Sequence, residues 1–111
     1  MPEITATMGP VLDGLMKTIQ QRRDADPKSS YTANLFSKGT KKIAQKVGEE
    51  GIEAALAAAT GDKEELVKES ADLLYHLMVL WADRGIDQID IIAELAKREG
   101  VSGIDERASR P

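Results

Sequence analysis

The sequence predicts an all-α protein, a bundle of four to five helices folded as a single domain over residues 1–111. Apolar residues recur at the three- and four-residue spacing of helices, and no segment alternates with a period of two over the length of a strand. Aromatic residues make up only 4% of the chain. The core must therefore come from Leu, Ile, Val, Met and Ala, which favours helices over strands.

The first third of the chain predicts two helices joined by a loop. Residues 9–23 begin with Pro10, which suits a first helical turn, and carry one apolar stripe. The polar residues 24–30 predict a loop, and residues 31–38 predict a short helix that ends at Gly39. The stripe of the first helix consists of Val11, Leu12, Leu15, Met16 and Ile19.

Two longer helices are expected to form an antiparallel hairpin. Thr40 is expected to cap the first, which runs to residue 60 and stops at Gly61. Two apolar stripes are expected on this helix, one of Ile43, Val47 and Ala54 and one of Ile52, Ala55, Leu56 and Ala59. A capping box of Asp62 and Glu65 opens the second helix.

The second helix of the hairpin is expected to be the most buried helix of the bundle. It continues to Arg84 before Gly85, and its apolar residues cover most of its circumference. Asp87 is expected to cap a last helix that ends near Gly100, which gives a helical core of about residues 9–100 and a loose tail at 101–111. The apolar residues of these two helices are Leu66, Val67, Ala71, Leu73, Leu74, Leu77, Met78, Leu80, Trp81, Ile89, Ile91, Ile92 and Leu95.

The composition excludes several classes of protein. The net charge is −4 without a dense basic stripe, which disfavours nucleic-acid binding. Because there is no cysteine, disulfides, thiolate metal sites and cysteine nucleophiles are excluded. The longest apolar run, residues 73–82, is too short to span a bilayer, and the N-terminus lacks the layout of a signal peptide. We therefore expect a cytoplasmic protein that binds no membrane.

Acidic residues gather in the two central helices. Glu49, Glu50 and Glu53 lie three or four apart in the first, and Glu69 and Asp72 lie three apart in the second, so each group shares a helix face. Asp72 lies in the stretch expected to be most buried, where an unpaired carboxylate costs on the order of several kcal/mol. Across an antiparallel hairpin these acids would converge, and Mg²⁺ or Mn²⁺ takes such oxygen ligands.

The acids and the lysines before them each have a simpler structural explanation. Acid pairs at this spacing are usually a solvated helix surface. Lys38, Lys42 and Lys46 precede the acids at intervals of four and would suit phosphate oxygens beside a metal ion. Lys46 is equally suited to pair with Glu49 or Glu50 on its own helix.

His76, Met78 and Trp81 follow the acids in sequence, and we expect them to have structural rather than catalytic roles. His76 lies one turn after Asp72, and we expect it to be a core or interface group hydrogen-bonded to that residue rather than a metal ligand. Met78 and Trp81 are expected in the core.

Two acidic motifs carry a resemblance to a known superfamily. Glu-Glu-x-x-Glu at residues 49–53 followed by Glu-x-x-Asp at 69–72 resembles the signature of the all-α nucleoside triphosphate pyrophosphohydrolases, the MazG-like group. More narrowly, Tyr-Thr-Ala-Asn-Leu at 31–35, Lys-Ile-Ala-Gln-Lys-Val-Gly-Glu-Glu at 42–50 and Glu-Ser-Ala-Asp-Leu-Leu-Tyr-His-Leu at 69–77 resemble the phosphoribosyl-ATP pyrophosphohydrolase family. The likeness covers nearly the whole domain.

This resemblance implies a MazG-like fold and a specific hydrolysis. Metal-activated water would cleave the α–β phosphoanhydride of 1-(5-phosphoribosyl)-ATP, giving 1-(5-phosphoribosyl)-AMP and pyrophosphate, the second step of histidine biosynthesis. The implied cofactor is Mg²⁺, with Mn²⁺ as a substitute. The family also implies a homodimer or a higher homo-oligomer with active sites near the subunit contact.

The resemblance also implies roles for particular residues. The implied metal ligands are Glu50, Glu53, Glu69 and Asp72. The implied catalytic residues are Glu49, which would hold a second metal or orient the attacking water, and Lys46. The candidate substrate contacts are Lys42, Lys46 and Lys38, which would balance the charge of the leaving pyrophosphate, and Tyr31, Thr32 and Asn34, to which the resemblance assigns no role.

Three other functions compete with this one. A house-cleaning hydrolase for noncanonical nucleotides would share the acids but would not need Tyr31-Thr32 or Tyr75-His76. A di-iron bundle would need Glu-x-x-His, which this chain lacks. A non-catalytic module that binds a partner helix would not need the acids at all.

Overall fold

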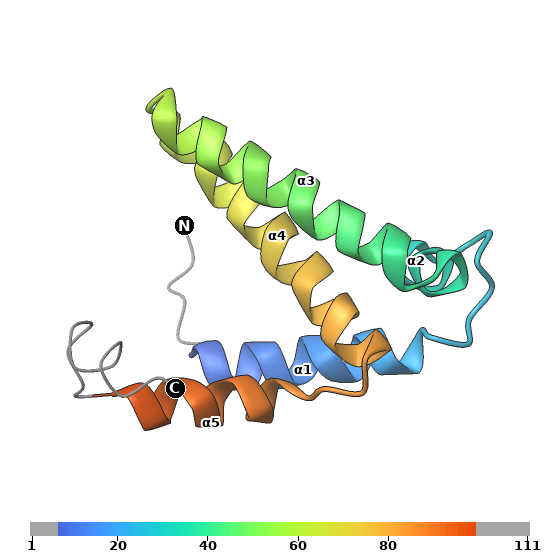
Figure 1. Ribbon diagram of the computed structural model, residues 1–111. Helices are drawn as coiled ribbons and strands as arrows, with labels where there is room; N and C mark the ends of the chain where they lie inside the picture. The colour runs from blue at the N-terminus through green and yellow to red at the C-terminus, as the bar shows by residue number, and fades with distance from the viewer. Residues whose placement is uncertain (1–6, 100–111) are drawn as a thin grey trace.

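A computed structural model describes residues 7–99, and this part of the chain consists of helices joined by short turns and irregular segments, with no strand. It contains five helices, α1 (Met8–Gln21), α2 (Tyr31–Lys38), α3 (Thr40–Ala59), α4 (Lys63–Asp83) and α5 (Gln88–Arg98) (Figure 1). The all-α prediction is therefore confirmed. No helix in this range has an apolar stretch long enough to cross a membrane.

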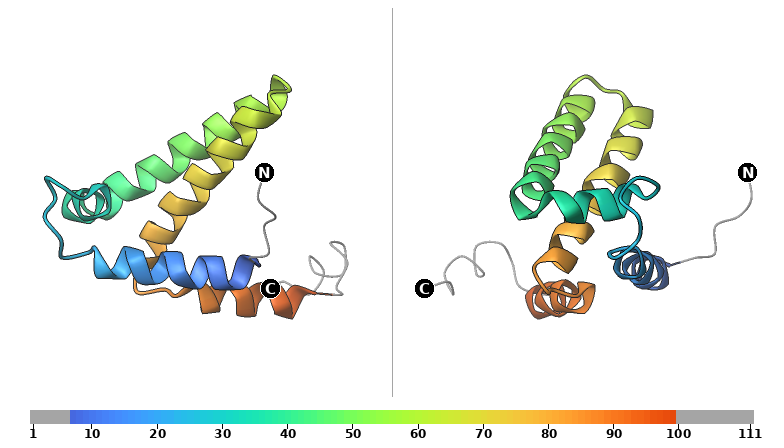
Figure 2. Two further views of the ribbon diagram at one scale, coloured as in Figure 1. Left: turned by 180° about the vertical axis from the view of Figure 1, so that it is seen from behind. Right: turned by 90° about the vertical axis from the view of Figure 1, so that its right-hand side faces the viewer.

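Helices α3 and α4 form a long antiparallel hairpin that is joined at Gly61, a residue with a φ of +78° that favours glycine (Figure 1). Helices α1 and α5 lie side by side across the base of α4 (Figure 2). The short helix α2 packs against both α3 and α4. The turn of the hairpin projects away from α1 and α5, so within residues 7–99 the outer part of the hairpin has no third helix beside it.

The core lies at the base of the hairpin, where α1, α2 and the two long helices meet. Four of its side chains, Ile19, Ile43, Met78 and Val79, are almost completely inaccessible to solvent. Burial of each contributes about 1.5–3 kcal/mol, and together they anchor α1, α3 and α4 against one another. The buried cluster consists of Met16, Ile19, Leu35, Ile43, Met78, Val79 and Ala82.

The predicted burial of the hairpin is wrong in its outer half. Ile52 and Leu56, two members of the second α3 stripe, are 64% and 59% exposed. Val67 on α4 is 69% exposed, so α4 is buried only toward its C-terminal end. Val11 on α1 is also exposed. Periodicity identifies an apolar face but does not say whether the same chain covers it.

The predicted cap of α3 is also wrong. Gly39, with a φ of +89°, occupies the N-cap position, and Thr40 is the first helical residue. The Thr40 hydroxyl donates a hydrogen bond to Asp83 Oδ2 at 2.6 Å instead. The threonine therefore joins the start of α3 to the end of α4, a tertiary role that local sequence does not reveal.

The other two predicted caps are present. Asp62 accepts a hydrogen bond from Glu65 N at 2.9 Å, but its own N–H donates to Ala57 O, so the reciprocal half of that capping box is missing. Asp87 and Asp90 form a complete capping box at α5. The predicted tail at 101–111 and the predicted helix end near Gly100 lie outside the described residues.

Candidate active site

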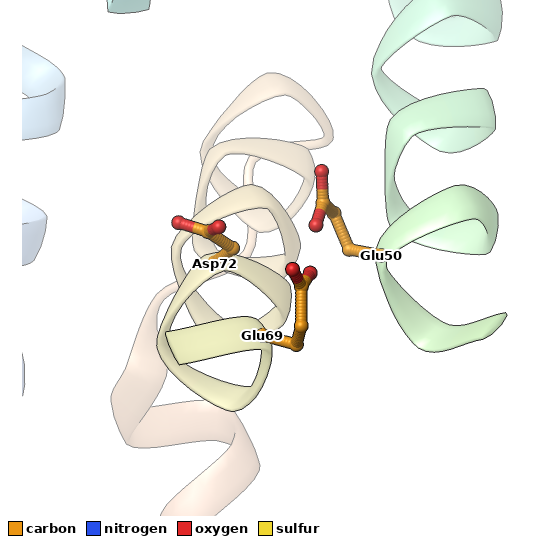
Figure 3. Close-up of side chains that lie close together, drawn as sticks. All are labelled: Glu50, Glu69 and Asp72. Carbon is orange, nitrogen blue, oxygen red and sulfur yellow. The ribbon is translucent and has the colours of Figure 1, made fainter. Parts of the chain in front are cut away.

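The hairpin brings acids of α3 and α4 to one level. Glu50 lies eleven residues before Gly61 and Asp72 eleven residues after it, so an antiparallel pair places them opposite each other. One carboxylate oxygen each from Glu50, Glu69 and Asp72 lies within 4.8 Å of the other two. The carboxyl groups of Glu50 and Glu69 face each other across the gap between the helices, with Asp72 one turn further along α4 (Figure 3).

Two of these carboxylates have buried oxygens without a partner. Glu50 is only 8% exposed, and within residues 7–99 neither its Oε2 nor Glu69 Oε2 has a hydrogen-bond partner. Buried polar atoms are normally paired, and leaving one unpaired costs about 1–3 kcal/mol. A divalent cation between the helices would satisfy both oxygens, and a donor set of three carboxylates suits Mg²⁺ or Mn²⁺.

The protonation of Glu69 reflects the same crowding. The protonated form of Glu69 can donate a hydrogen bond to the carboxylate of Glu53, and burial and the nearby carboxylates of Glu65 and Glu50 add to this effect, so the pKa of Glu69 is raised to about 8. Protonation of Glu69 therefore competes with the binding of a cation to these carboxylates. Glu53 itself is exposed and lies outside the group of three.

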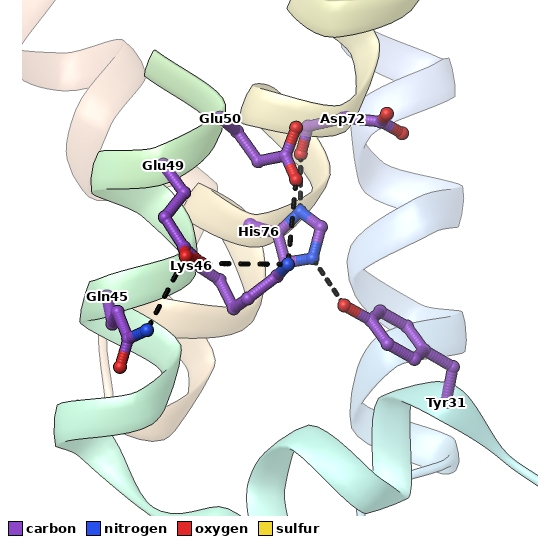
Figure 4. Close-up of polar contacts among 7 residues, drawn as sticks. All are labelled: Tyr31, Gln45, Lys46, Glu49, Glu50, Asp72 and His76. Carbon is purple, nitrogen blue, oxygen red and sulfur yellow. Dashed lines mark hydrogen bonds and ion pairs between the residues drawn. The ribbon is translucent and has the colours of Figure 1, made fainter. Parts of the chain in front are cut away.

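Lys46 and Glu49 form a polar border on the α3 side. The Lys46 Nζ lies 3.8 Å from Glu49 Oε1 and 3.8 Å from Glu50 Oε1 (Figure 4). Gln45 Nε2 donates a long hydrogen bond of 3.4 Å to Glu49 Oε2. Glu49 therefore points along its own helix toward Lys46 and Gln45. Both ion pairs expected from helical spacing are present.

Aromatic side chains connect α2 to α4 beside the acids. The Tyr31 Oη lies 2.8 Å from His76 Nε2, and His76 Nδ1 lies 2.7 Å from the backbone carbonyl oxygen of Asp72 (Figure 4). The hydroxyl of Thr32 is hydrogen-bonded to that of Tyr75. The Tyr31 and Tyr75 rings are stacked with centroids 6.3 Å apart, and His76 packs edge-on against both. This cluster fixes the start of α2 next to the carboxylates.

The sequence model described as phosphoribosyl-ATP pyrophosphohydrolase (PRA-PH) matches residues 12–99. The chain belongs to this family. The matched range contains all the acids described above and the whole aromatic cluster, and it ends one residue after α5.

Relatives of similar length support this membership. A phosphoribosyl-ATP pyrophosphatase of Azospirillum brasilense is 58% identical over 100 residues, which are 90% of each chain. One of Rhizorhabdus wittichii is 55% identical over 100 residues, 90% of this chain and 94% of the relative. One of Rhodospirillum rubrum is 52% identical over 110 residues, 98% of this chain and 94% of the relative. The chain is accordingly a hydrolase, which excludes the non-catalytic module and the di-iron bundle.

The geometry brings together only part of the predicted PRA-PH site. Glu50, Glu69 and Asp72 converge, and Lys46 and Tyr31 border them. Three further candidates remain apart from these contacts. Within residues 7–99, the side chains of Asn34, Lys38 and Lys42 make none of the hydrogen bonds or ion pairs described above.

Two features of the site differ from the sequence prediction. Asp72 is exposed and not buried, although it lies in the stretch of α4 that the sequence predicted to be most buried. His76 is buried and hydrogen-bonded to Asp72 as predicted, and its partner atom is the backbone carbonyl oxygen of that residue. Tyr75 was missing from the predicted site. Its position three residues after Asp72 places it one turn from the acids, and that spacing was the available signal.

Proposed function

We propose that this chain hydrolyses 1-(5-phosphoribosyl)-ATP to 1-(5-phosphoribosyl)-AMP and pyrophosphate with Mg²⁺ as cofactor. The observation that carries the proposal is the pair of buried, unpartnered oxygens on Glu50 and Glu69 in a chain of the PRA-PH family. Oxygens held on two rigid helices are preorganised for a hard cation and need no rearrangement to bind it.

The proposal assigns each polar group a place. Glu50, Glu69 and Asp72 would hold the metal ion, and Glu53 borders it on the side of Glu69. A bound Mg²⁺ would neutralise phosphate charge and orient the phosphoanhydride. Lys46 lies beside the carboxylates and would receive an anionic phosphate oxygen.

Glu49 and the remaining candidates keep secondary roles in this proposal. Glu49 would orient the attacking water after its pair with Lys46 loosens, since that ion pair is partly exposed and such pairs contribute only about 0–1 kcal/mol. The candidates for more distant substrate contacts are Tyr31, Thr32, Asn34, Lys38 and Lys42.

A direct assay tests the substrate. The purified protein should release pyrophosphate from phosphoribosyl-ATP when Mg²⁺ is present and lose that activity with a chelator. A panel of canonical and noncanonical deoxynucleoside triphosphates serves as the comparison. Higher kcat/KM for any member of the panel would favour the house-cleaning alternative and defeat the substrate assignment.

The pH dependence of Mg²⁺ binding should follow Glu69. Its pKa of about 8 lies above the value of 4.5 for an unperturbed carboxyl. Without metal, protonated Glu69 contributes fully to folding stability below pH 4.5, and this contribution is lost as the pH rises through about 8. Mg²⁺ binds the ionised form of Glu69. The affinity of the protein for Mg²⁺, and the rise in melting temperature that Mg²⁺ causes, should therefore grow as the pH rises toward about 8.

Calorimetric titration and thermal melts at acidic and alkaline pH measure this effect. The variant Glu69→Gln should bind Mg²⁺ weakly at every pH and show no such rise. The same Mg²⁺-induced increase in melting temperature at both pH values would contradict the role of Glu69.

We also infer that two copies of the chain pair through the outer half of the hairpin. Ile52 and Leu56, one turn apart on α3, and Val67 on α4 are exposed apolar side chains of this part of the hairpin. A second hairpin would bury these apolar side chains in a symmetric contact.

Analytical ultracentrifugation tests this pairing. The wild type should sediment as a dimer, and Leu56→Glu should shift it to monomer at micromolar concentration, because a charge at the centre of an apolar contact opposes association. Ile89→Glu, on an equally exposed residue of α5, is the matched control and should remain dimeric. A dimeric Leu56→Glu variant would place the contact elsewhere. A cytoplasmic location and the lack of nucleic-acid or membrane partners remain predictions.

A further inference from the structure

A chain of hydrogen bonds runs from the backbone beside the carboxylates to Tyr31. His76 lies at its centre and is only 5% exposed. Its Nδ1 contacts the Asp72 carbonyl oxygen at 2.7 Å, and its Nε2 contacts the Tyr31 hydroxyl at 2.8 Å (Figure 4). Both nitrogens are therefore committed to neighbouring groups, and neither is free to bind a ligand.

The chemistry of these groups fixes the direction of both bonds. A carbonyl oxygen has no proton, so Nδ1 must donate to Asp72. In a neutral imidazole the other nitrogen is then an acceptor, so the Tyr31 hydroxyl donates to Nε2. A phenol has one proton. Once that proton faces His76, the hydroxyl presents only lone pairs to its other side.

Tyr31 lies beside the proposed active site, because His76 links its hydroxyl to the backbone of Asp72. Tyr31 begins α2, and half of its side chain remains exposed. Burial of the hydroxyl raises the pKa of Tyr31, and the nearby charge of Lys46 opposes this rise while those of Glu50 and Asp72 add to it. The hydroxyl is therefore within electrostatic reach of the carboxylates and of the lysine beside them.

We propose that His76 is a positioning residue that fixes Tyr31 as a hydrogen-bond acceptor in the active site. Tyr31 then receives an O–H donor, either a ribose hydroxyl of the nucleotide or a water coordinated to the metal ion, and rejects phosphate oxygens, which have no proton to give. The ligand part of this inference rests on the proposed function, but the direction of the hydrogen bonds does not.

Nuclear magnetic resonance tests the direction without any substrate. The chain contains a single histidine, so the imidazole nitrogen signals of the untagged protein belong to His76 alone. In mildly alkaline buffer, ¹⁵N correlation spectra should show the neutral tautomer protonated at Nδ1. Tyr31→Phe should keep this tautomer and shift the Nε2 resonance. A ring protonated at Nε2, alone or together with Nδ1, would overturn the proposal.

Steady-state kinetics test the coupling. Loss of one uncharged hydrogen bond should raise KM for phosphoribosyl-ATP roughly threefold to tenfold in Tyr31→Phe and His76→Phe, with kcat within about twofold. The double variant should be no worse than either single one, because both remove the same bond. His76→Gln should recover most of the loss, since its amide oxygen accepts in place of Nε2.

Additive losses in the double variant would show that His76 acts independently of Tyr31 and would overturn the proposal. Thr40→Val is the matched control. It also removes a side-chain hydrogen bond between helices, but it lies ten residues along α3 from Glu50, about 15 Å away. Its KM and kcat should equal those of the wild type.

A titration with Mn²⁺ in the absence of nucleotide separates the two donors. If Tyr31 accepts from a metal-bound water, Tyr31→Phe should weaken Mn²⁺ binding. If it accepts from a ribose hydroxyl, Mn²⁺ affinity should be unchanged while KM rises. No change in either quantity would overturn the proposal. If the wild type fails to hydrolyse phosphoribosyl-ATP, the proposed function falls, while the tautomer experiment still decides the role of His76.

Discussion

Glu50→Gln should lower kcat/KM for phosphoribosyl-ATP by at least roughly a hundredfold while the helical fold persists. Glu50 is buried at the centre of the carboxylate group, and one of its oxygens has no partner in the described residues. The amide has nearly the same shape but lacks the charge that a cation requires. Because the change also removes a negative charge near Glu69, the metal-free variant should melt at or above the temperature of the wild type.

Pyrophosphate release, Mg²⁺ titration and circular dichroism together measure this prediction. Glu64→Gln is the matched control, because Glu64 is an exposed acid in the first turn of α4 outside the carboxylate group. It should retain the activity and Mg²⁺ affinity of the wild type. Near-normal turnover in Glu50→Gln would remove the carboxylate group from the mechanism. An unfolded Glu50→Gln variant would make this residue structural.

Ile43→Ala should destabilise the protein by about 2–5 kcal/mol. Ile43 has no solvent exposure and packs in the cluster that joins α3 to α1 and α4. Truncating it removes apolar contact and leaves a cavity in a small domain, whose total stability is about 5–15 kcal/mol. The melting temperature should fall by roughly 10 °C or more, since 1 kcal/mol corresponds to about 4–8 °C in a domain of this size.

Urea denaturation followed by circular dichroism gives the free energy of unfolding directly. Ile89→Ala removes the same atoms from a side chain that is 65% exposed, and it should cost less than about 1 kcal/mol. Equal losses in the two variants would mean that the buried cluster is not the main source of stability.

Local patterns were reliable wherever a residue's role depends on its neighbours in sequence. The bounds of α2, the stop at Gly61 and the caps at Asp62 and Asp87 follow from such patterns and are present in the structure. The convergence of acids from α3 and α4 also follows from an antiparallel hairpin, but Glu53, which was expected among the ligands, lies outside the group of Glu50, Glu69 and Asp72.

Sequence patterns failed to predict the burial or the contacts of a residue where these depend on which other helix packs against it. Val67 has the periodicity of a core residue, yet it is exposed because α1 and α5 cover only the base of α4. Thr40 is a residue type that often caps helices, but its hydroxyl donates a hydrogen bond to Asp83 on another helix. The hydroxyls of Tyr75 and Thr32 are hydrogen-bonded although the two residues are 43 apart in sequence, and helical periodicity does not predict contacts over such a separation.

By itself, the sequence determined that this chain is helical, that α3 and α4 form a hairpin, and that their acids face one another. These features follow from helical period and turn chemistry, which act over a few residues. Only the tertiary structure decided which acids are buried, which oxygens lack partners and how His76 orients Tyr31. Those properties depend on the packing of whole helices against one another, and that packing sets the desolvation and hydrogen bonding of each polar atom.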